Sequence, residues 1–600
     1  MKYYVADFET TTREDNCHVW AYAVCEVGNS EEIVIGKTLD EFMQWCKDQK
    51  DNPKVFFHNL KFDSQFIIRW LFLHGFTHVE DVKDKATNTF TTLISDKGLY
   101  YSLEVVFHRK GKKIHKITFI DSLKLIPLSV DAIAKSFHLD IQKGKIDYTA
   151  HDDLPEGSDL TPEEEEYIKH DVQIVAHAVD FFHKQGLDKM TIGSCALAEY
   201  KKIIHKRNFD RYFPPPKFHD DVKQSYRGGF TYLNPKYASK TVKRGIVLDV
   251  NSLYPSVMYD SYLPYGTPIF FVGKYEEDDF YPLYTQMIKC QFEIKKGKIP
   301  TIQIKHSMFF RANEYLTSSE GEEEVLCLNS VDLKLFLEHY DVYNLEYLSG
   351  WKFRGTRGLF VDYIDKWSSA KIQAKKDKNH GLYLISKLFL NSLYGKFGTD
   401  NKVKSKIPYL EDGIVKYKDG AVEEKDGIYV AMASFITSYA RLKTISAAQR
   451  IQDNFHSKKS KSEFVYADTD SLHINLNGES EEEFFSHCGL DIDPTKLGAW
   501  DHEATFRRAK FLRQKCYIED HIISEDEYIK GIHGEEPFLY QMDDEGFYKL
   551  KITVAGMPSG CYPEVTFNNF KIGAKYSGKK QPKIVEGGVI LRDIDFTISN

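Results

Sequence analysis

The sequence predicts a mixed α/β, multidomain fold, and three observations support this prediction. At about 150 residues per domain, the 600 residues of the chain allow about four compact units. Apolar residues make up 42% and charged residues 28% of the chain, an ordinary globular composition that excludes collagen-like, disordered and coiled-coil proteins. Short apolar runs typical of strands alternate with helical patterns along the whole sequence.

Charge, cysteine usage and hydropathy exclude several classes of protein. The 80 Lys and Arg residues against 88 Asp and Glu give a net charge of −8, which argues mildly against a purely electrostatic nucleic-acid binder. The nine cysteines include no CxxC pair, so we expect reduced thiols without a zinc site or disulfide framework. No apolar run approaches the about 18 residues of a membrane span, and the N-terminus lacks the apolar region of a signal peptide. We therefore expect an intracellular protein with no membrane partner.

The first predicted strand, over residues 2–8, leads directly into Asp7-Phe8-Glu9. Alternate residues of a strand face the same side, so both carboxylates would project together, and a divalent cation would relieve their repulsion. A second apolar run, 55–57, ends in His58-Asn59-Leu60-Lys61-Phe62-Asp63. Taken alone, these acids are explained better as solvated groups at strand ends.

A well-marked helix start follows at Thr161-Pro162-Glu163-Glu164, where Thr161 is the expected N-cap and Glu164 completes a capping box. Tyr167 and Asp171 share a face of this helix at i, i+4 and could hold a water or a phosphate oxygen near a metal. A surface Asp beside a packed Tyr is the alternative. Acids from separate elements suit two hard divalent ions, and this region offers four: Asp7, Glu9, Asp63 and Asp171.

Pro214-Pro215-Pro216 is the clearest break in the chain, and we place a domain boundary before it, near residue 190. A predicted strand, 245–250, contains Asp249 and ends before Ser252-Leu253-Tyr254-Pro255. A strand-to-helix junction there would present backbone N–H groups to phosphate, with Tyr254 as a flat wall. Tyr466-Ala467-Asp468-Thr469-Asp470-Ser471 again places alternate carboxylates on one face, although an acidic hairpin turn is the alternative.

The remaining segments add a helix stripe and a basic run. Residues 359–395 contain two helical patterns, and Lys387, Asn391 and Tyr394 form one stripe on the second. This stripe could grip a nucleotide, or it could be a partly amphipathic helix with a solvated Lys. Residues 404–427 have the turns and charges of a hairpin insertion, and the stretch after 549 is strand-like. The run 507–517 interleaves five cations with aromatic residues, which suits a phosphate backbone.

In this order, the segments resemble the motifs of family B DNA polymerases, and in particular the protein-primed group of phi29-like bacteriophages. Three segments resemble the exonuclease motifs: 7–9, 59–63 and 167–171. Four resemble the polymerase motifs: 249–255, 387–395, 466–471 and 515–517. Two more resemble a motif between the two sites and a template–primer motif: Tyr226-Arg227-Gly228-Gly229 and Thr437-Ser438-Tyr439-Ala440-Arg441. Any one match is weak, but nine in register along the whole chain are specific.

The resemblance implies a ribonuclease H-like 3′→5′ exonuclease domain joined to a right-hand polymerase domain with two insertions. The limits that it implies are 1–189 for the exonuclease domain, 190–303 and 429–548 for the palm, 304–358 for the first insertion, 359–398 for the fingers, 399–428 for the second insertion and 549–600 for the thumb. In the family, the insertions dock a terminal protein and close a tunnel around DNA.

The resemblance also implies roles for single residues. Asp249, Asp470 and the main chain of Val250 would hold two metal ions for synthesis, with Asp468 nearby; Mg²⁺ is expected and Mn²⁺ should replace it. The incoming nucleotide would meet Val250, Tyr254, Lys371, Lys387, Asn391 and Tyr394. In the exonuclease, Asp7, Glu9, Asp63 and Asp171 would bind metals, while Tyr167 and Lys143 would assist the attack. DNA contacts are expected at His58, Asn59, Phe62, Ser122, Leu123, Tyr226, Gly228, Gly229, Ser252, Thr437, Arg441, Lys515 and Tyr517.

The implied function is a DNA-directed DNA polymerase with a proofreading exonuclease that replicates a linear viral genome by protein priming and strand displacement. Its partners would be template–primer DNA, single-stranded DNA, dNTPs and a terminal protein, and we expect a monomer in the cytoplasm of a bacterial host. One alternative is an exonuclease with an inactive polymerase half, which is disfavoured because Asp249, Asp468, Asp470 and Lys387 are all present. The other is a non-catalytic DNA-binding replication factor that needs no Mg²⁺.

Overall fold

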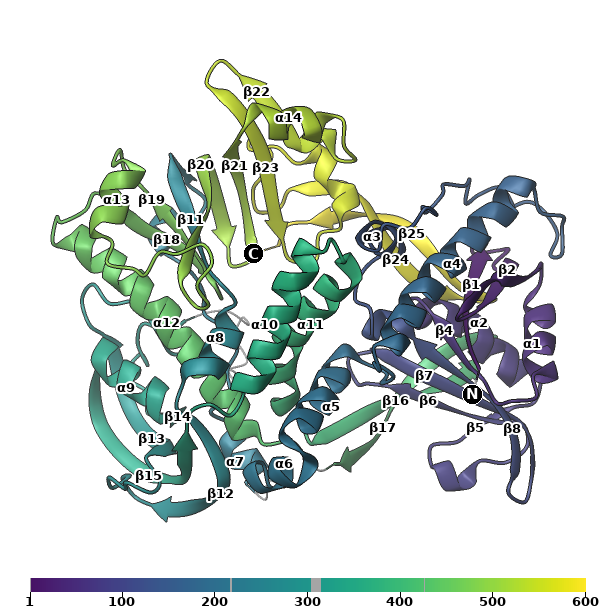
Figure 1. Cartoon of the computed structure of the whole chain (residues 1–600), viewed down its shortest axis with the longest axis horizontal. Helices are drawn as coiled ribbons and strands as arrows, with labels where there is room; N and C mark the ends of the chain where they lie inside the picture. Colours follow the sequence, from purple (N-terminus) through teal and green to yellow (C-terminus); the bar gives the residue numbers. More distant parts are fainter. Residues whose placement is uncertain (1, 216–217, 304–314, 426, 600) are drawn as a thin grey trace.

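The computed structural model describes residues 2–215, 218–303, 315–425 and 427–599, and it confirms the mixed α/β, multidomain prediction. The strands form two large sheets, one smaller sheet and two long hairpins, with helices between them (Figure 1). None of the helices in these ranges is both long and apolar enough to cross a lipid bilayer. All nine cysteines are buried and unpaired.

The N-terminal unit is built on an eight-stranded sheet with the strand order β3-β2-β1-β4-β8-β7-β6-β5. Strand β4 is parallel to both of its neighbours, β1 and β8, so the carboxyl ends of these three strands meet at one edge of the sheet. The strands are β1 (Tyr3–Thr10), β2 (Val19–Glu26), β3 (Asn29–Gly36), β4 (Lys54–Phe57), β5 (Thr77–His78), β6 (Thr89–Ile94), β7 (Tyr100–Lys110) and β8 (Lys113–Asp121). The helices are α1 (Leu39–Asp48), α2 (Leu60–Leu73), α3 (Val130–Ser136) and α4 (Pro162–Lys184).

Helix α4 begins where the sequence predicts. The hydroxyl of Thr161 accepts from the backbone N–H of Glu164 at 3.2 Å, and the Glu164 carboxylate accepts from the Thr161 N–H at 2.8 Å, so the capping box is confirmed. Helix α4 packs on β1 and β2 and thereby fixes the face on which Tyr167 and Asp171 lie.

The central unit contains a nine-stranded sheet with the order β22-β23-β21-β20-β11-β19-β18-β9, to which β10 adds at β20. The predicted strand over 245–250 is confirmed as β11, which pairs with β19 on one side and β20 on the other. The strands are β9 (Thr231–Leu233), β10 (Thr241–Val242), β11 (Gly245–Val250), β18 (Glu463–Asp468), β19 (Ser471–Asn475), β20 (Trp500–Arg513), β21 (Cys516–Ile523), β22 (Tyr540–Asp543) and β23 (Gly546–Val554).

Helices surround this sheet and connect it to the N-terminal unit. The longest is α12, and one buried apolar cluster runs from α4 through α5 and α11 to α12. The break at Pro214-Pro215-Pro216 falls between α6 and α7, and Pro216 lies outside the described residues. The helices are α5 (Ile192–Ile204), α6 (Lys206–Tyr212), α7 (His219–Lys223), α8 (Leu253–Asp260), α12 (Val430–His456), α13 (Glu481–His487) and α14 (Glu525–Ile532).

A four-stranded sheet with the order β12-β15-β13-β14 lies beside the central unit. Strands β12 and β13 precede residue 304 and yet pair with β15, so this sheet starts at Leu263 and crosses the predicted start of the first insertion, which stays a prediction. Residue 304 itself lies outside the described residues. The elements are β12 (Leu263–Val272), β13 (Leu283–Ile294), β14 (Glu324–Asn329), α9 (Ser330–His339) and β15 (Tyr340–Thr356).

The two helical patterns predicted within 359–395 are confirmed as an antiparallel pair, α10 (Val361–Lys376) and α11 (His380–Phe397). The hairpin predicted after them is also confirmed, as β16 (Lys402–Glu411) and β17 (Ile414–Glu424).

The C-terminal region is strand-rich, as predicted. The predicted limit at residue 549 falls inside β23, which pairs with β21 along its whole length, so the central sheet continues to Val554. The separate C-terminal hairpin consists of β24 (Lys575–Val585) and β25 (Gly588–Thr597).

The β16–β17 and β24–β25 hairpins both extend from the central unit to the N-terminal unit, where they pack on helix α2 (Figure 1). The turn of the C-terminal hairpin approaches α2 closely, because a Cβ at Gly588 would lie 2.2 Å from the Phe66 ring; only glycine fits there. The β16–β17 hairpin is joined to the N-terminal unit by the backbone bond from Asp96 N–H to Lys404 O, 2.8 Å.

Candidate active sites

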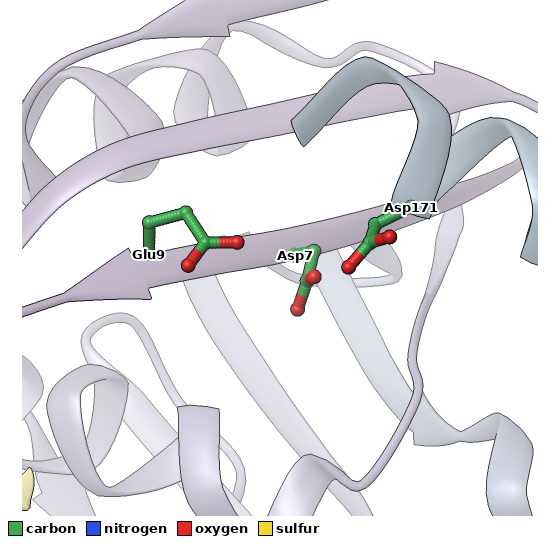
Figure 2. Close-up of side chains that lie close together, drawn as sticks. All are labelled: Asp7, Glu9 and Asp171. Atoms are coloured by element: carbon green, nitrogen blue, oxygen red, sulfur yellow. The ribbon is translucent and has the colours of Figure 1, made fainter. Parts of the chain in front are cut away.

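Asp7 and Glu9 lie on β1, and Asp171 projects toward them from α4 (Figure 2). One carboxylate oxygen of each lies within 4.8 Å of the others. Asp63, in the first turn of α2, lines the same cleft as these three acids. We call the four acids the N-terminal carboxylate site; the structure brings them to one cleft, and their binding of metal stays a prediction.

Burial and mutual repulsion make these carboxylates costly to ionise. Burial raises the pKa of Asp7 to about 7, and the charge of Asp171 adds to the effect. Burial also raises the pKa of Glu9 and of Asp63 well above their ordinary values. The Oδ1 atom of Asp171 is buried with no hydrogen-bond partner among the described residues. A divalent cation would satisfy this oxygen and offset the repulsion, so the residues fit a metal.

Two further side chains predicted for this site lie beside Asp171. The ammonium of Lys143 donates to Asp171 Oδ2 at 2.5 Å and lies 5.3 Å from the centre of the Tyr167 ring. The Tyr167 hydroxyl is bonded to that of Tyr148 at 2.9 Å. Tyr148 was not predicted, because it lies in an irregular segment in which no periodicity marks it.

The residues predicted to hold a single strand follow the parallel strands β4 and β8. Nδ1 of His58 is 3.0 Å from the Ser122 hydroxyl, which is fully buried and donates to the carbonyl of Phe57. Asp121, which the sequence analysis missed, accepts from the N–H groups of both Asn59 and Leu123 at 3.1 and 3.0 Å. This shared carboxylate fixes the two loops relative to each other.

The second candidate site lies at the centre of the nine-stranded sheet. Asp249 is the second-last residue of β11 and pairs with Ser471, and the Val250 N–H donates to the Asp470 carbonyl at 2.8 Å. Asp468 ends the neighbouring strand β18. We call Asp249, Asp468 and Asp470 the central carboxylate site, because Asp249 and Asp468 both pair with Ser471, the neighbour of Asp470; their binding of metal stays a prediction.

The charges at the central site are also mutually repulsive. Burial raises the pKa of Asp249 to about 7, with further contributions from Asp470, Glu503 and Asp501. No sequence pattern marks Asp501 or Glu503 on β20. Asp501 pairs with Asp249 in the register of β11 on β20, and Glu503 lies two residues further along the same strand. The arrangement suits divalent cations, although the three predicted acids are more widely spread than those of the N-terminal site.

Lys515 forms an ion pair with one of the central acids. Its ammonium donates to Asp468 Oδ1 at 2.7 Å, while its backbone N–H donates to the hydroxyl of Tyr466 at 2.8 Å. Lys515 is exposed, but Tyr517 is only 7% exposed and packs against Tyr466. Tyr517 therefore packs behind Tyr466, which in turn holds the main chain of Lys515. Its direct contact with DNA stays a prediction.

A flat aromatic wall stands next to the central site. The rings of Tyr254 and Tyr394 are stacked, with centroids 4.0 Å apart and planes 17° apart. Burial raises the pKa of the Tyr254 phenol, so this hydroxyl stays protonated. Tyr226 packs against Gly398, where a Cβ would lie 2.6 Å from its hydroxyl.

The two lysines predicted to bind a triphosphate are at least partly exposed to solvent. Lys387 and Asn391 are exposed on α11, and Lys371 is half-buried on α10. Neither lysine has an ion-pair partner within the part of the chain that the structure describes. Ser252 precedes α8 with a left-handed backbone, φ 57°.

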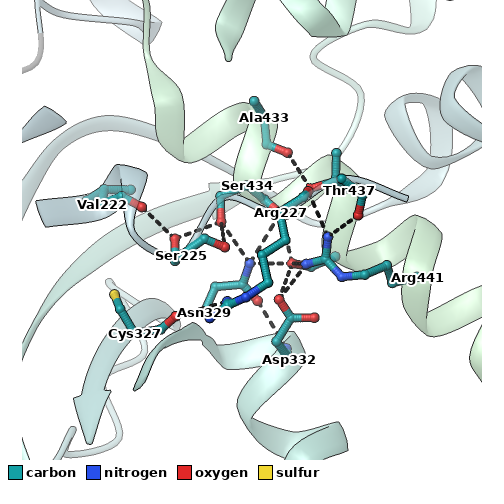
Figure 3. Close-up of polar contacts among 12 residues, drawn as sticks. Val222, Ser225, Arg227, Cys327, Asn329, Asp332, Ala433, Ser434, Thr437 and Arg441 are labelled. Atoms are coloured by element: carbon teal, nitrogen blue, oxygen red, sulfur yellow. Dashed lines mark hydrogen bonds and ion pairs between the residues drawn. The ribbon is translucent and has the colours of Figure 1, made fainter. Parts of the chain in front are cut away.

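The loop at Gly228 and Gly229 is held between the central site and helix α12. A Cβ at Gly229 would lie 2.7 Å from the side chain of Thr469, so only glycine fits beneath the acidic turn. Arg441 donates to the carbonyls of Arg227 and Gly228 at 2.8 and 2.7 Å (Figure 3).

Arg441 and Thr437 were predicted to contact DNA, but both are buried in this structure. Arg441 is 3% exposed and pairs with Asp332, and the Thr437 hydroxyl donates to the carbonyls of Ala433 and Ser434 in its own helix. Their direct contact with DNA stays a prediction. Both residues lie on α12, and Arg441 holds the glycine loop through the carbonyls of Arg227 and Gly228.

Two separate carboxylate sites, an aromatic wall and two lysines without ion-pair partners among the described residues form an arrangement that suits metal-dependent chemistry on nucleotides. The chain matches the family of DNA polymerase type B, organellar and viral, over residues 46–157 and 151–483. It belongs to this family and is a DNA-directed DNA polymerase, and the predicted resemblance is confirmed.

Individual relatives agree over the full length. The chain is 46% identical to the DNA polymerases of Bacillus phage M2 and Bacillus phage phi29, and each alignment covers 100% of this chain and 99% of the relative. It is also similar in structure to phi29 DNA polymerase complexed with primer-template DNA, with a TM-score of 0.89, 44% identity and full coverage of both chains. The chain is thus a member of the phi29-like phage group.

Proposed function

We propose that the central carboxylate site elongates DNA and that the N-terminal carboxylate site removes nucleotides from the 3′ end. The observation that carries this proposal is the presence of two separate groups of converging acids on two different sheets. The N-terminal unit would be the exonuclease domain, the nine-stranded sheet the palm, α10 and α11 the fingers, and the β24–β25 hairpin part of the thumb.

The central site would hold two Mg²⁺ ions through Asp249, Asp470 and the carbonyl of Val250, with Mn²⁺ able to replace them. Such ions stabilise the attacking and leaving oxygens of an in-line phosphoryl transfer. Lys515 already pairs with Asp468 and would orient the primer end beside the acids. The primer 3′-hydroxyl would attack the α-phosphate of the dNTP and pyrophosphate would leave.

The aromatic wall and the exposed lysines would select and hold the nucleotide. Tyr254, fixed by its stack on Tyr394, would exclude a ribose 2′-hydroxyl, and Tyr394 would pack against the new base pair. Lys371 and Lys387 would neutralise the triphosphate. Solved structures of phi29 DNA polymerase contain primer-template DNA and incoming nucleotide substrates, and we extend this binding to the present chain.

The exonuclease half would act on a frayed 3′ end. Phe62 lines the cleft of the N-terminal site and would stack on an unpaired base, while Tyr167 and Lys143 would position the water that cuts the last phosphodiester. Phi29 DNA polymerase has been solved with single-stranded DNA, which supports a strand path of this kind here.

We further propose protein priming and strand displacement on a linear phage genome, in the cytoplasm of the bacterial host. A hydroxyl of a terminal protein would replace the primer 3′-hydroxyl at initiation. Support comes from the two inserted elements, the four-stranded sheet and the β16–β17 hairpin, and from the similarity to phi29-like polymerases. The active species would be a monomer.

Primer extension and 3′ trimming test the two-site proposal. Asp249→Ala and Asp470→Ala should abolish dNTP incorporation and retain trimming, whereas Asp7→Ala with Glu9→Ala should abolish trimming and spare synthesis. Loss of both activities in either variant would contradict two separate sites. An exonuclease with an inactive polymerase half would incorporate no dNTP even as the wild type, and a non-catalytic DNA-binding factor would show neither activity.

Protein priming needs its own experiment. Incubation with a candidate terminal protein, labelled dATP and Mg²⁺ should give a covalent nucleotide–protein adduct that Asp249→Ala cannot form. A chain that extends a DNA primer but forms no adduct with the terminal proteins of its phage would contradict protein priming while leaving the polymerase assignment intact.

A further inference from the structure

The cleft of the N-terminal carboxylate site extends beyond the N-terminal unit. It is a cavity of about 560 Å³, and two of its lining residues, Lys406 and Tyr417, come from the β16–β17 hairpin. They are more than 230 residues away in sequence from Asp171, and no motif of the sequence marks either one. The hairpin therefore forms one wall of the same cleft that holds the acids and Phe62.

A buried glutamine fixes Tyr417 in this wall. The Tyr417 hydroxyl donates to Gln65 Oε1 at 2.8 Å, and Gln65 Nε2 donates to the Tyr100 hydroxyl at 3.0 Å and to the Lys61 carbonyl at 2.9 Å. Gln65 is 2% exposed and lies two residues after Asp63 on α2. All hydrogen-bonding groups of its amide except one acceptor position are thereby engaged, so the ring of Tyr417 is held in a defined place.

The state of the Tyr417 hydroxyl agrees with this arrangement. Burial, and next the neighbouring Tyr100, raise the pKa of Tyr417 above its ordinary value, so the hydroxyl stays protonated and can donate. The rings of Tyr100 and Tyr417 meet edge to face with centroids 6.1 Å apart. The ring of Tyr417 is therefore fixed by its packing on Tyr100 and by the hydrogen bond of its hydroxyl to Gln65.

Lys406 adds a positive charge to the same wall. Its ammonium pairs with Asp419 across the hairpin at 2.5 Å, and both side chains are partly exposed, at 31% and 45%. An exposed ion pair of this kind contributes little stability. A phosphate entering the cleft can therefore replace Asp419 as the partner of Lys406 at small cost.

We propose that the β16–β17 hairpin supplies a subsite for single-stranded DNA, in which Tyr417 stacks on the nucleotide that precedes the scissile phosphodiester. Lys406 binds the phosphate of that nucleotide, and Gln65 is a positioning residue that acts through Tyr417. A base and its phosphate match an aromatic ring beside a cation. This inference rests on the proposed exonuclease activity of the N-terminal site.

Two substrates separate this subsite from the cutting chemistry. One is a single-stranded oligodeoxynucleotide, and the other is the p-nitrophenyl ester of thymidine 5′-monophosphate, which has no preceding nucleotide. Tyr417→Ala should raise KM for the oligonucleotide about tenfold, leave kcat within about twofold, and leave hydrolysis of the ester unchanged. Gln65→Leu and Tyr417→Phe should each give a smaller rise in KM, and the double variant should add nothing to either.

The cation is tested by salt. Lys406→Ala should raise KM for the oligonucleotide and flatten its dependence on salt by about one unit of log–log slope. Lys416→Ala is the matched control, because Lys416 pairs with Glu411 on the same hairpin but does not line the cleft. It should leave both KM and the salt slope unchanged.

Other outcomes overturn the inference. If Tyr417→Ala slows the oligonucleotide and the ester equally, Tyr417 supports the fold and binds no nucleotide. If neither substrate is affected, the strand does not pass the hairpin. Failure of the underlying function is distinct: a wild-type chain that cuts neither substrate has no exonuclease activity to which the subsite could belong.

Discussion

Arg441 and Asp332 form a buried ion pair, with Nη2 2.6 Å from Oδ2, although 109 residues separate them. Their side chains are 3% and 11% exposed. The same Asp332 oxygen accepts from the Ser438 hydroxyl at 2.7 Å, and Arg441 also binds the main chain of the glycine loop. These bonds therefore connect helix α9 and helix α12 to the loop at Gly228 and Gly229.

Removal of the Asp332 carboxylate should destabilise the protein and loosen the loop at Gly228 and Gly229. Asp332→Ala leaves the guanidinium of Arg441 buried without its counter-ion, which costs about 3–5 kcal/mol. Urea unfolding of the variant and hydrogen exchange of the amides around Gly228 measure the effect. Asp491→Ala is the matched control, because Asp491 pairs with Lys496 at the surface and should cost less than about 1 kcal/mol. Equal costs for both variants would contradict the supporting role.

The stacked pair of Tyr254 and Tyr394 predicts how the polymerase discriminates between sugars. Tyr254→Val removes the ring that stands next to the central acids and should raise incorporation of ribonucleotides relative to dNTPs by at least about tenfold. Tyr394→Phe keeps the ring of the stack and should leave the ratio unchanged. Single-nucleotide primer extension with each nucleotide type measures the ratio, and an unchanged ratio in Tyr254→Val would contradict the assignment.

The repulsion within the N-terminal carboxylate site predicts that loss of one acid raises the stability of the metal-free protein and weakens its binding of metal. Glu9→Gln removes one buried like charge and should stabilise the metal-free protein by about 1–2 kcal/mol. It should also reduce the rise in Tm that Mg²⁺ produces, because a metal ligand is lost. Thermal unfolding with EDTA and with Mg²⁺ measures both effects. Glu163→Gln, at the exposed start of α4, should change neither; a destabilised Glu9→Gln would contradict the repulsion.

Much of both sites could be predicted because their residues follow local rules. Asp7 and Glu9 alternate on one strand, and Tyr167 and Asp171 share one helix face, so the sequence fixes which side chains point together. The parallel pairing of β1, β4 and β8 then brings the segments after these strands to one edge. The convergence of the four acids followed from these features together with the family resemblance.

The rest depends on contacts that no local pattern encodes. Asp121 accepts hydrogen bonds from two loops, and Tyr148 bonds to Tyr167 on helix α4. Asp501 faces Asp249 only through the register of β20 on β11. Two sheets cross the predicted limits at 304 and 549 for the same reason, since β13 pairs with β15 some fifty residues later. The burial of Arg441 likewise depends on Asp332, from a distant helix.

His78 predicts a dependence of stability on pH at the edge of the N-terminal unit. Its side chain is packed edge to face on Phe90, and its Nε2 is 2.9 Å from the Thr92 hydroxyl. Burial, and next the charge of Lys418 on the β16–β17 hairpin, lower the pKa of His78 to about 4. The unfolded chain takes up this proton below about pH 6.5, whereas the folded chain does so only near pH 4.

Because the unfolded state binds the proton first, stability should fall as the pH drops from 6.5 toward 4, by at most about 3 kcal/mol from this residue. His78→Gln can keep the bond to Thr92 without titrating, so its Tm should fall less than that of the wild type between pH 7 and pH 5. His74→Gln, whose side chain is 47% exposed at the end of α2, should fall as much as the wild type. Equal slopes for wild type and His78→Gln would show that His78 takes up its proton as readily in the folded chain as in the unfolded one, and that the hairpin charge of Lys418 does not reach it.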